Sequence, residues 1–249
     1  MQREAASDLP LRSRLIDFLI QSSLRLQLSP TEKYTALSIF AHRFYPRFMC
    51  KLEQGNDMGS WLLQPLRESN LQLFALVSLW ISNKMHSSPA LSVKIFKSLG
   101  DKSISEQHFT IRDYSEAEVV LMQVVNFEIC VENIAFVYFE ELLLQFKGVA
   151  KVGELVNFEA GMDIMDLLYE KEETTMLYAN PRFLAASVLV ASYVTTVPKQ
   201  KLEFPVLPWV KFVTGCEEVD VAEMVREILK HVFHLSCWNL KSGEGNSYQ

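Results

Sequence analysis

The sequence predicts an all-α protein made of two tandem five-helix units, each built around a central apolar helix. Glycine and proline are scarce, at 9 each among 249 residues, while hydrophobic residues reach 49%. This composition favours long helices over a turn-rich β fold. No strands are predicted between the helical segments, and neither GxGxxG nor GxxxxGK[ST] occurs, which argues against Rossmann and P-loop folds. A faint repeat of about 105–110 residues supports two similar units.

Two pairs of segments carry this repeat. Phe74-Ala-Leu-Val-Ser-Leu-Trp-Ile-Ser82 resembles Leu184-Ala-Ala-Ser-Val-Leu-Val-Ala-Ser192, and both read as central helices rich in Ala and Ser. At a similar offset, Ala117-Glu-Val-Val matches Ala222-Glu-Met-Val. We therefore place one unit at residues 8–130 and the other at 131–238, and we expect the tail at 239–249 to be disordered.

The first unit opens with an amphipathic helix over residues 11–26, because its apolar residues recur along one broad stripe. Ser29 and Pro30 begin a second helix that runs to about residue 44. Ser29 is a suitable N-cap, Pro30 suits the first helical position, and Glu32 completes a capping box. Residues 50–60 are polar with two glycines and predict a loop.

The central helix of the first unit is predicted from about residue 66 to 85, where the chain is almost continuously apolar. A short helix follows at about 90–98, and another at about 114–126, for which Ser115 and Glu118 form an S-x-x-E capping pattern. The helices predicted for the second unit cover residues 131–147, 154–170, 181–196, 206–214 and 218–235.

Charge and composition disfavour several classes of function. The net charge of −6 argues against bulk binding to nucleic acid, which needs Lys and Arg facing the phosphates. No apolar run is long enough for a membrane span, and the first residues lack the apolar core of a secretory signal. The four cysteines form no CxxC and are expected as buried free thiols. We expect an intracellular protein, in the nucleus or the cytoplasm.

Sites for catalysis or metal binding are not predicted. Neither GxSxG nor HExxH occurs. His231, His234 and Cys237 recur at helical spacing near the end of the chain and are residue types that bind zinc, but no fourth ligand is apparent. We therefore expect no metal and no cofactor.

Several motifs, in this order and spacing, resemble the cyclin box. Leu11-Arg-Ser-Arg-Leu-Ile-Asp-Phe-Leu19 is similar to the cyclin signature M-R-x-I-L-V-D-W-L, and His42-Arg-Phe-Tyr45 to the D-R-F-L that ends the second helix. Leu71-Gln-Leu73 through Ser82-Asn-Lys84 resembles the L-Q-L…A-S-K helix, and Phe127-Glu-Ile129 the F-D/E-I/L that ends the fifth. Pro181-Arg-Phe-Leu-Ala-Ala-Ser187 resembles the start of the second central helix. The likeness spans about residues 8–235, and the pattern as a whole is most similar to the plant J-type cyclins.

The resemblance implies a regulatory subunit without catalytic residues, which forms a heterodimer with a cyclin-dependent protein kinase and activates it in cell-cycle control. A lysine and a glutamate of the family contact the kinase, and their matches here are Lys84 and Glu118. The apolar residues Phe74, Val77 and Ile81 are further candidates for the kinase contact or for the core. Taken without the family, Lys84 is an ordinary helix-terminal lysine and Glu118 a capping acid.

The family also docks R-x-L motifs of substrates or inhibitors in a shallow groove. The matching positions are Leu11, Arg12, Leu15, Phe18 and Gln72. Two residues depart from the family pattern: Gln21 replaces an acid, and His42 replaces the aspartate that pairs with the arginine at the position of Arg12. Because a buried arginine without a partner is costly, we expect Arg12 to find another acceptor or to be partly exposed.

The sequence disfavours two other classes of function. A cyclin-fold transcription adaptor resembling general transcription factor B requires a basic stripe over both units, which the acidic balance disfavours. An all-helical enzyme requires an assembled nucleophile–base or carboxylate pair, and the sequence shows none.

Overall fold

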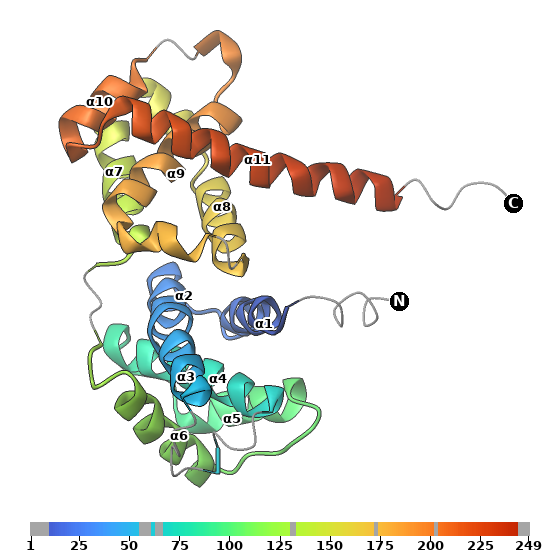
Figure 1. The fold of residues 1–249 in the computed structure, drawn as a ribbon. Coiled ribbons are helices and arrows are strands. Elements are labelled where there is room, and N and C mark those ends of the chain that lie inside the picture. The colour runs from blue at the N-terminus through green and yellow to red at the C-terminus, as the bar shows by residue number, and fades with distance from the viewer. Residues whose placement is uncertain are drawn as a thin grey trace, which may run out of the picture. The chain divides into compact units, whose positions relative to one another are not determined.

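The predicted helical class is confirmed. The computed structural model describes residues 10–54, 61–62, 67–129, 133–171, 174–201 and 204–243, and in these ranges every regular element is a helix. The chain divides into two compact units. The first comprises residues 1–132 together with 169–172, and the second comprises residues 133–168 and 173–249. Each unit wraps its helices around a central one, α4 in the first and α9 in the second (Figure 1).

In its described residues, the first unit is built from five helical rods. Its elements are α1 (Leu11–Arg25), α2 (Pro30–Leu37), the π-helical segment η1 (Ser38–Phe44), α3 (Tyr45–Glu53), α4 (Glu68–His86), α5 (Val93–Ser103) and α6 (Ile111–Val124). Elements α2, η1 and α3 follow one another without a break and form one rod. Pro46 lacks an N–H and its ring crowds the preceding turn, which explains why the rod widens to a π-helix just before it.

The start of the predicted loop at 50–60 is wrong, because α3 continues to Glu53. Residues 50–53 carry no helix breaker, and the first glycine of this stretch is at position 55. Residues 55–60 lie outside the part of the chain that the structure describes. Cys50 on α3 is a free but exposed thiol, so the expected burial is wrong at this position. The predicted capping box at the start of α2 is confirmed, since the Ser29 side chain accepts from the Glu32 N–H and the Glu32 carboxylate accepts from the Ser29 N–H at 2.7 Å.

Helix α4 is the centre of the first unit. It packs against α1, α2, α5 and α6, and it is buried on nearly every side. Small side chains such as Ala75 and Ser78 let the neighbouring helices approach closely, and the Ser78 hydroxyl is satisfied by the Phe74 carbonyl at 2.9 Å. The Phe74 ring stacks on Phe44 with 4.6 Å between ring centroids. This apolar contact joins α4 to the α2–η1–α3 rod.

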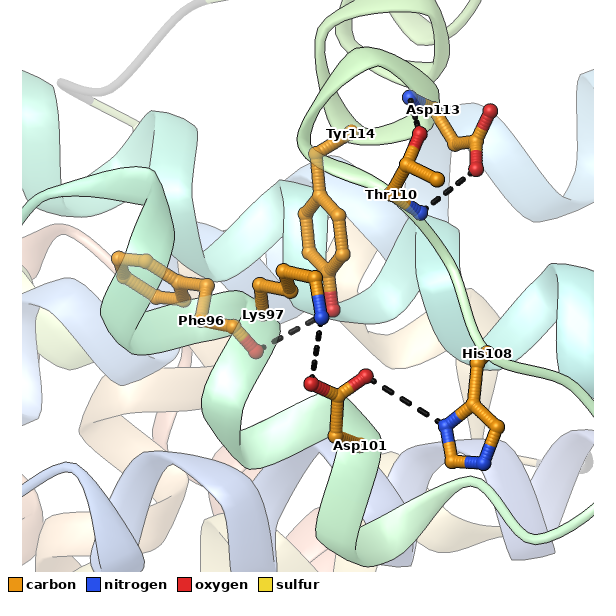
Figure 2. Close-up of polar contacts among 7 residues, drawn as sticks. All are labelled: Phe96, Lys97, Asp101, His108, Thr110, Asp113 and Tyr114. Atoms are coloured by element: carbon orange, nitrogen blue, oxygen red, sulfur yellow. Dashed lines mark hydrogen bonds and ion pairs between the residues drawn. The ribbon is translucent and has the colours of Figure 1, made fainter.

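Helix α6 begins at Ile111, four residues before the predicted cap at Ser115. The actual N-cap is Thr110, whose hydroxyl accepts from the Asp113 N–H while the Asp113 carboxylate accepts from the Thr110 N–H at 2.7 Å (Figure 2). The Ser115 hydroxyl instead donates to the Ile111 carbonyl within the helix. The predicted capping role of Ser115 and Glu118 is therefore wrong, and the Glu118 carboxylate is available for another contact.

The junction of α5 and α6 is closely packed (Figure 2). The buried Tyr114 hydroxyl donates to the Phe96 carbonyl at 3.2 Å, and burial raises the pKa of Tyr114. Gly100 faces this hydroxyl: a Cβ at that position would lie 2.3 Å from the Tyr114 oxygen. The absence of a side chain at Gly100 therefore allows α5 to lie against α6.

The second unit repeats this plan around α9. Its elements are α7 (Ala135–Val149), η2 (Lys151–Leu155), α8 (Phe158–Glu170), η3 (Thr175–Ala179), α9 (Pro181–Thr196), η4 (Lys199–Lys201), α10 (Val206–Thr214) and α11 (Glu218–Gly243). The last residues of α8 are grouped with the first unit. Helix α9 packs against α7, α10 and α11. A Cβ at Gly161 of α8 would lie 2.2 Å from the Phe139 ring, so glycine is needed for α8 to approach α7.

The end of the chain is helical for longer than the sequence indicates. Helix α11 continues to Gly243, into the stretch 239–249 for which disorder was predicted. Residues 244–249 lie outside the described part of the chain. The predicted domain limits at 130 and 238 stay a prediction.

Candidate functional site

Lys84 and Glu118, which are separated by 34 positions in the sequence, form an ion pair on the surface of the first unit. Lys84 is in the last turn of α4, and Glu118 is in the middle of α6. The Lys84 ammonium also lies over the Trp80 ring, 4.0 Å from its centroid. Both side chains keep part of their surface open, with exposures of 35% and 28%. The two residues singled out by sequence are thus brought together at an accessible place.

Apolar side chains accompany the ion pair. Val119 follows Glu118 and is 53% exposed, Met85 follows Lys84 and is 41% exposed, and Trp80 is partly exposed. We call these five residues, Trp80, Lys84, Met85, Glu118 and Val119, the α4–α6 surface. A charged pair beside exposed aromatic, methionine and aliphatic side chains has the composition of a protein–protein contact.

Sequence reasoning did not identify the role of Trp80. Its position four residues before Lys84 could have predicted the contact, because side chains at i and i+4 meet on one helix face. The contact is a cation–π interaction, and it restricts where the long lysine side chain can point. The Trp80 ring and the Glu118 carboxylate therefore hold the ammonium group in place.

The three apolar candidates Phe74, Val77 and Ile81 lie in the core. Phe74 and Val77 are fully buried, and Ile81 is 3% exposed. They face the helices packed around α4, so they do not contribute to the α4–α6 surface in this structure. Burying their side chains stabilises the unit that carries Lys84 and Glu118.

A buried network around Glu32 anchors the end of α4 next to Lys84. The Glu32 carboxylate accepts from the Asn83 amide at 2.6 Å and from the Ser87 hydroxyl at 2.7 Å. The Ser82 hydroxyl donates to the Glu32 carbonyl at 2.7 Å. Residues on both sides of Lys84 are therefore tied to α2. Burial alone would raise the pKa of Glu32, but hydrogen bonds from Ser87, Ser29 and Asn83 lower it below its usual value.

The lowered pKa of Glu32 leads to a prediction about how the stability of the protein depends on pH. Because Glu32 holds its proton less tightly in the folded than in the unfolded chain, its contribution is present above the unfolded pKa of 4.5 and is lost as pH falls below it. Glu32→Gln resembles the protonated acid. We expect the wild type to unfold at higher urea than Glu32→Gln at neutral pH, and the difference to shrink as pH falls below about 4.5.

Urea unfolding followed by circular dichroism at a series of pH values measures this difference. Glu106→Gln, a change of the same kind at an exposed position, is the control and should give no such pH-dependent gap. A gap that stays constant through pH 4 would show that the charge of Glu32 does not hold the network together.

Two arginines in the interior of the α2–η1–α3 rod bind the segment that follows α6. Arg47 donates to the Val125 carbonyl and to the Glu128 carboxylate, both at 2.6 Å, and Arg43 donates to the Glu128 carbonyl at 2.5 Å. The hydrogen bond and the charge of Arg47 lower the pKa of Glu128. These contacts fix the chain where α6 ends.

The residues predicted to form the R-x-L groove differ in how far they are exposed. Docking of R-x-L motifs stays a prediction. Leu11, Phe18 and Gln72 are half-buried, but Leu15 is fully buried in the core. Gln21 is exposed, and its amide donates to the Asp17 carboxylate at 3.4 Å.

Arg12 is 5% exposed and has found another acceptor, as expected: it donates to the Tyr169 carbonyl at 2.8 Å, within the first unit. His42, which stands where the family pattern has an aspartate beside this arginine, is uncharged. Burial, together with the charges of Arg12 and Arg43, lowers the pKa of His42 to about 3. A neutral imidazole adds no positive charge beside Arg12, which explains how histidine is tolerated there.

Metal and membrane sites find no support in the described residues. No group of three or more His, Cys, Asp or Glu side chains is arranged there to hold a metal ion. The side chains of His234 and Cys237 lie outside the described part. Among the helices of that part, none combines the length and apolar character needed to cross a bilayer.

Comparison with known proteins agrees with the helical fold. Residues 1–130 match the family model for the cyclin N-terminal domain. The chain is 57% identical over 224 residues to Cyclin-J18 of Arabidopsis thaliana, which covers 90% of this chain and 95% of that protein. It is 50% identical over 226 residues to Cyclin-J18-like of Oryza sativa subsp. japonica, with 89% and 87% covered.

A solved structure shares the fold. The X-ray structure of a viral cyclin from herpesvirus saimiri matches with a TM-score of 0.64 at 15% identity, over 89% of this chain and 84% of that one. The family match over just over half of the chain and the high identity to the two plant proteins lead to one conclusion. The chain belongs to the cyclin family, and within it to the plant J-type cyclins.

Proposed function

We propose that this cyclin binds a cyclin-dependent protein kinase as its regulatory subunit and activates it in cell-cycle control, in the nucleus or the cytoplasm. Cyclins are regulatory rather than catalytic proteins, so a regulatory role follows from family membership. The observation that carries the more specific proposal is the α4–α6 surface, where Lys84 and Glu118 meet at an accessible place.

The polar part of this surface suits a docked helix. An ammonium group donates hydrogen bonds and a carboxylate accepts them, so the pair can satisfy free main-chain carbonyl and N–H groups of a partner beside its docked helix. Hydrogen bonds to charged groups are stronger than neutral ones. The family resemblance assigns this role to the lysine and the glutamate at these positions.

The pair is prepared for binding before the partner arrives. Trp80 and Glu118 restrict the Lys84 side chain, and the Glu32 network fixes the turn of α4 that carries it. A long side chain that is already ordered loses less conformational entropy on binding. The exposed apolar groups of Trp80, Met85 and Val119 supply area that is removed from water on contact.

Activation then follows from a shift in population. A kinase must assemble its own lysine–glutamate pair to orient ATP, which requires its mobile helix to move inward. A rigid helical surface that binds the inward conformation better than the outward one stabilises the active state by the difference between the two binding free energies. The cyclin contributes no reacting group.

Affinity purification tests the proposal directly. The tagged chain is purified from dividing plant tissue, the recovered proteins are identified by mass spectrometry, and the recovered kinase is then assayed with and without purified cyclin. We expect a cyclin-dependent kinase whose phosphorylation rate rises on addition of the chain. Recovery of complexes without a kinase, or a kinase whose rate is unchanged, would show that this function is wrong.

A further inference from the structure

The second unit carries an open groove that the kinase contact does not use. Its volume is about 690 Å³, and it lies between the end of α7, the turn η2 and the segment that leads into α10. The apolar lining comes from Ala150, Val152, Leu155, Phe204 and Pro205. The other lining residues in the described part of the chain are Lys151 and Lys201. All of these residues belong to one unit.

The wall formed by η2 is held tightly against α7. The Ala150 N–H donates to the Phe146 carbonyl at 3.0 Å, and the Gly153 N–H donates to the Ala150 carbonyl at 2.8 Å. A Cβ at Gly153 would lie 2.8 Å from the Lys147 backbone nitrogen. Glycine at this position therefore lets the turn fold back onto the helix, and the wall that carries Lys151, Val152 and Leu155 is built into the backbone.

The opposite wall is anchored by aromatic packing. The Phe204 ring lies 5.1 Å from the buried Phe146 ring and 6.4 Å from Trp209, between ring centroids. The Val206 N–H donates to the Phe204 carbonyl at 2.8 Å, and the Lys201 N–H donates to the Pro198 carbonyl at 2.8 Å. The described residues of both walls are thus held in place before anything binds, and side chains that are already placed lose little freedom on binding.

The described lining of this groove carries a charge opposite in sign to the net charge of the chain. The chain has a net charge of −6, yet the ionisable side chains among the described lining residues are both lysines. Both are exposed, and neither makes an ion pair with another residue in the described ranges. Glu154 is exposed on the same turn but does not line the groove. Ammonium groups without an ion-pair partner, next to an apolar lining, can bind a ligand whose apolar groups have carboxylates on either side.

We propose that this groove docks a short segment of a partner protein in which apolar side chains are flanked by Asp or Glu. The apolar residues of the segment cover Val152, Leu155 and Phe204, and its carboxylates meet Lys151 and Lys201. Two lysines are too few for a phosphate backbone, which needs a longer basic track. The exposed Leu155, at 39%, gives the segment an apolar anchor point. The inference is independent of the kinase contact, which lies on the first unit.

The test measures binding of a fluorescein-labelled peptide, Ser-Glu-Asp-Phe-Asp-Leu-Glu-Ser, to the full chain by fluorescence anisotropy. We expect saturable binding that weakens as salt rises. The double variant Lys151→Glu/Lys201→Glu should bind at least about tenfold more weakly, because like charges then face each other. Leu155→Ala should also weaken binding. A version of the peptide with Gln and Asn for its acids, and one with Ala for Phe and Leu, should each bind more weakly than the parent.

Matched controls separate the groove from general electrostatics. Lys94→Glu/Lys102→Glu makes the same change in net charge on exposed residues of α5 in the first unit and should leave the affinity unchanged. Circular dichroism checks that each variant is folded. Equal binding by the wild type and the Lys151→Glu/Lys201→Glu variant, or no binding of the parent peptide, would overturn the proposal. So would sedimentation showing that a second copy of the chain occupies the groove.

Discussion

Replacing Lys84 and Glu118 together with alanine is expected to weaken kinase binding by about 100-fold or more and to abolish activation. The free energy of unfolding of the cyclin should change by less than about 1 kcal/mol, because an ion pair that is partly open to water at the surface contributes little to stability. The loss of function thus comes from contacts with the partner. Surface plasmon resonance with the purified kinase, together with urea unfolding of the variant, measures both quantities.

A charge-swapped variant separates the two roles that the pair might have. Lys84→Glu/Glu118→Lys keeps an ion pair between α4 and α6 but exchanges the donor and the acceptor. If the pair serves only to join the two helices, the swapped variant should activate the kinase normally. If the two side chains bind main-chain groups of the kinase, as proposed, the swap should fail as severely as the double alanine variant.

A control pair tests the position of the proposed contact. Glu227 and Lys230 form an exposed ion pair on α11 of the second unit, and Glu227→Ala/Lys230→Ala removes the same number of charges. This variant should bind and activate as the wild type does. Normal activation by Lys84→Ala/Glu118→Ala would place the kinase contact elsewhere on the molecule.

Phe74→Ala is expected to have the largest effect on stability, a loss of about 3–5 kcal/mol in the free energy of unfolding. The Phe74 side chain is fully buried in α4 and stacks on Phe44, so truncation leaves a cavity at the centre of the first unit. Kinase binding per folded molecule should be unchanged, because the side chain does not reach the surface. Urea unfolding, and binding scaled to the folded fraction, distinguish this result from a direct contact.

A milder variant covers the case in which Phe74→Ala does not fold. Phe74→Leu keeps most of the apolar volume and should cost about 1–2 kcal/mol while leaving the intrinsic affinity for the kinase unchanged. A large loss of affinity in a stable Phe74→Leu protein would show that Phe74 belongs to the contact after all.

Local signals in the sequence predicted which segments are helical more reliably than the residues at which each helix begins and ends. The Ser29–Glu32 capping box was identified correctly because its partners are three residues apart. At α6 the sequence offers both Thr110-x-x-Asp113 and Ser115-x-x-Glu118. Packing selects the first, since Tyr114 must lie on the helix to reach Phe96 across the α5 junction. A sequence window holds no information about that distant partner.

The sequence by itself determined the all-helical class, the two central apolar helices and the family-like positions Lys84 and Glu118, because helical periodicity and motif spacing are properties of neighbouring residues. Only the tertiary structure decided that Phe74 is core while Val119 is surface, that Trp80 lies beneath Lys84, and that Arg12 finds the Tyr169 carbonyl. It also assembled the lysine-lined groove from segments about 50 residues apart. Burial and pairing depend on which surfaces meet in space, and residues far apart in the chain meet only once the helices have packed.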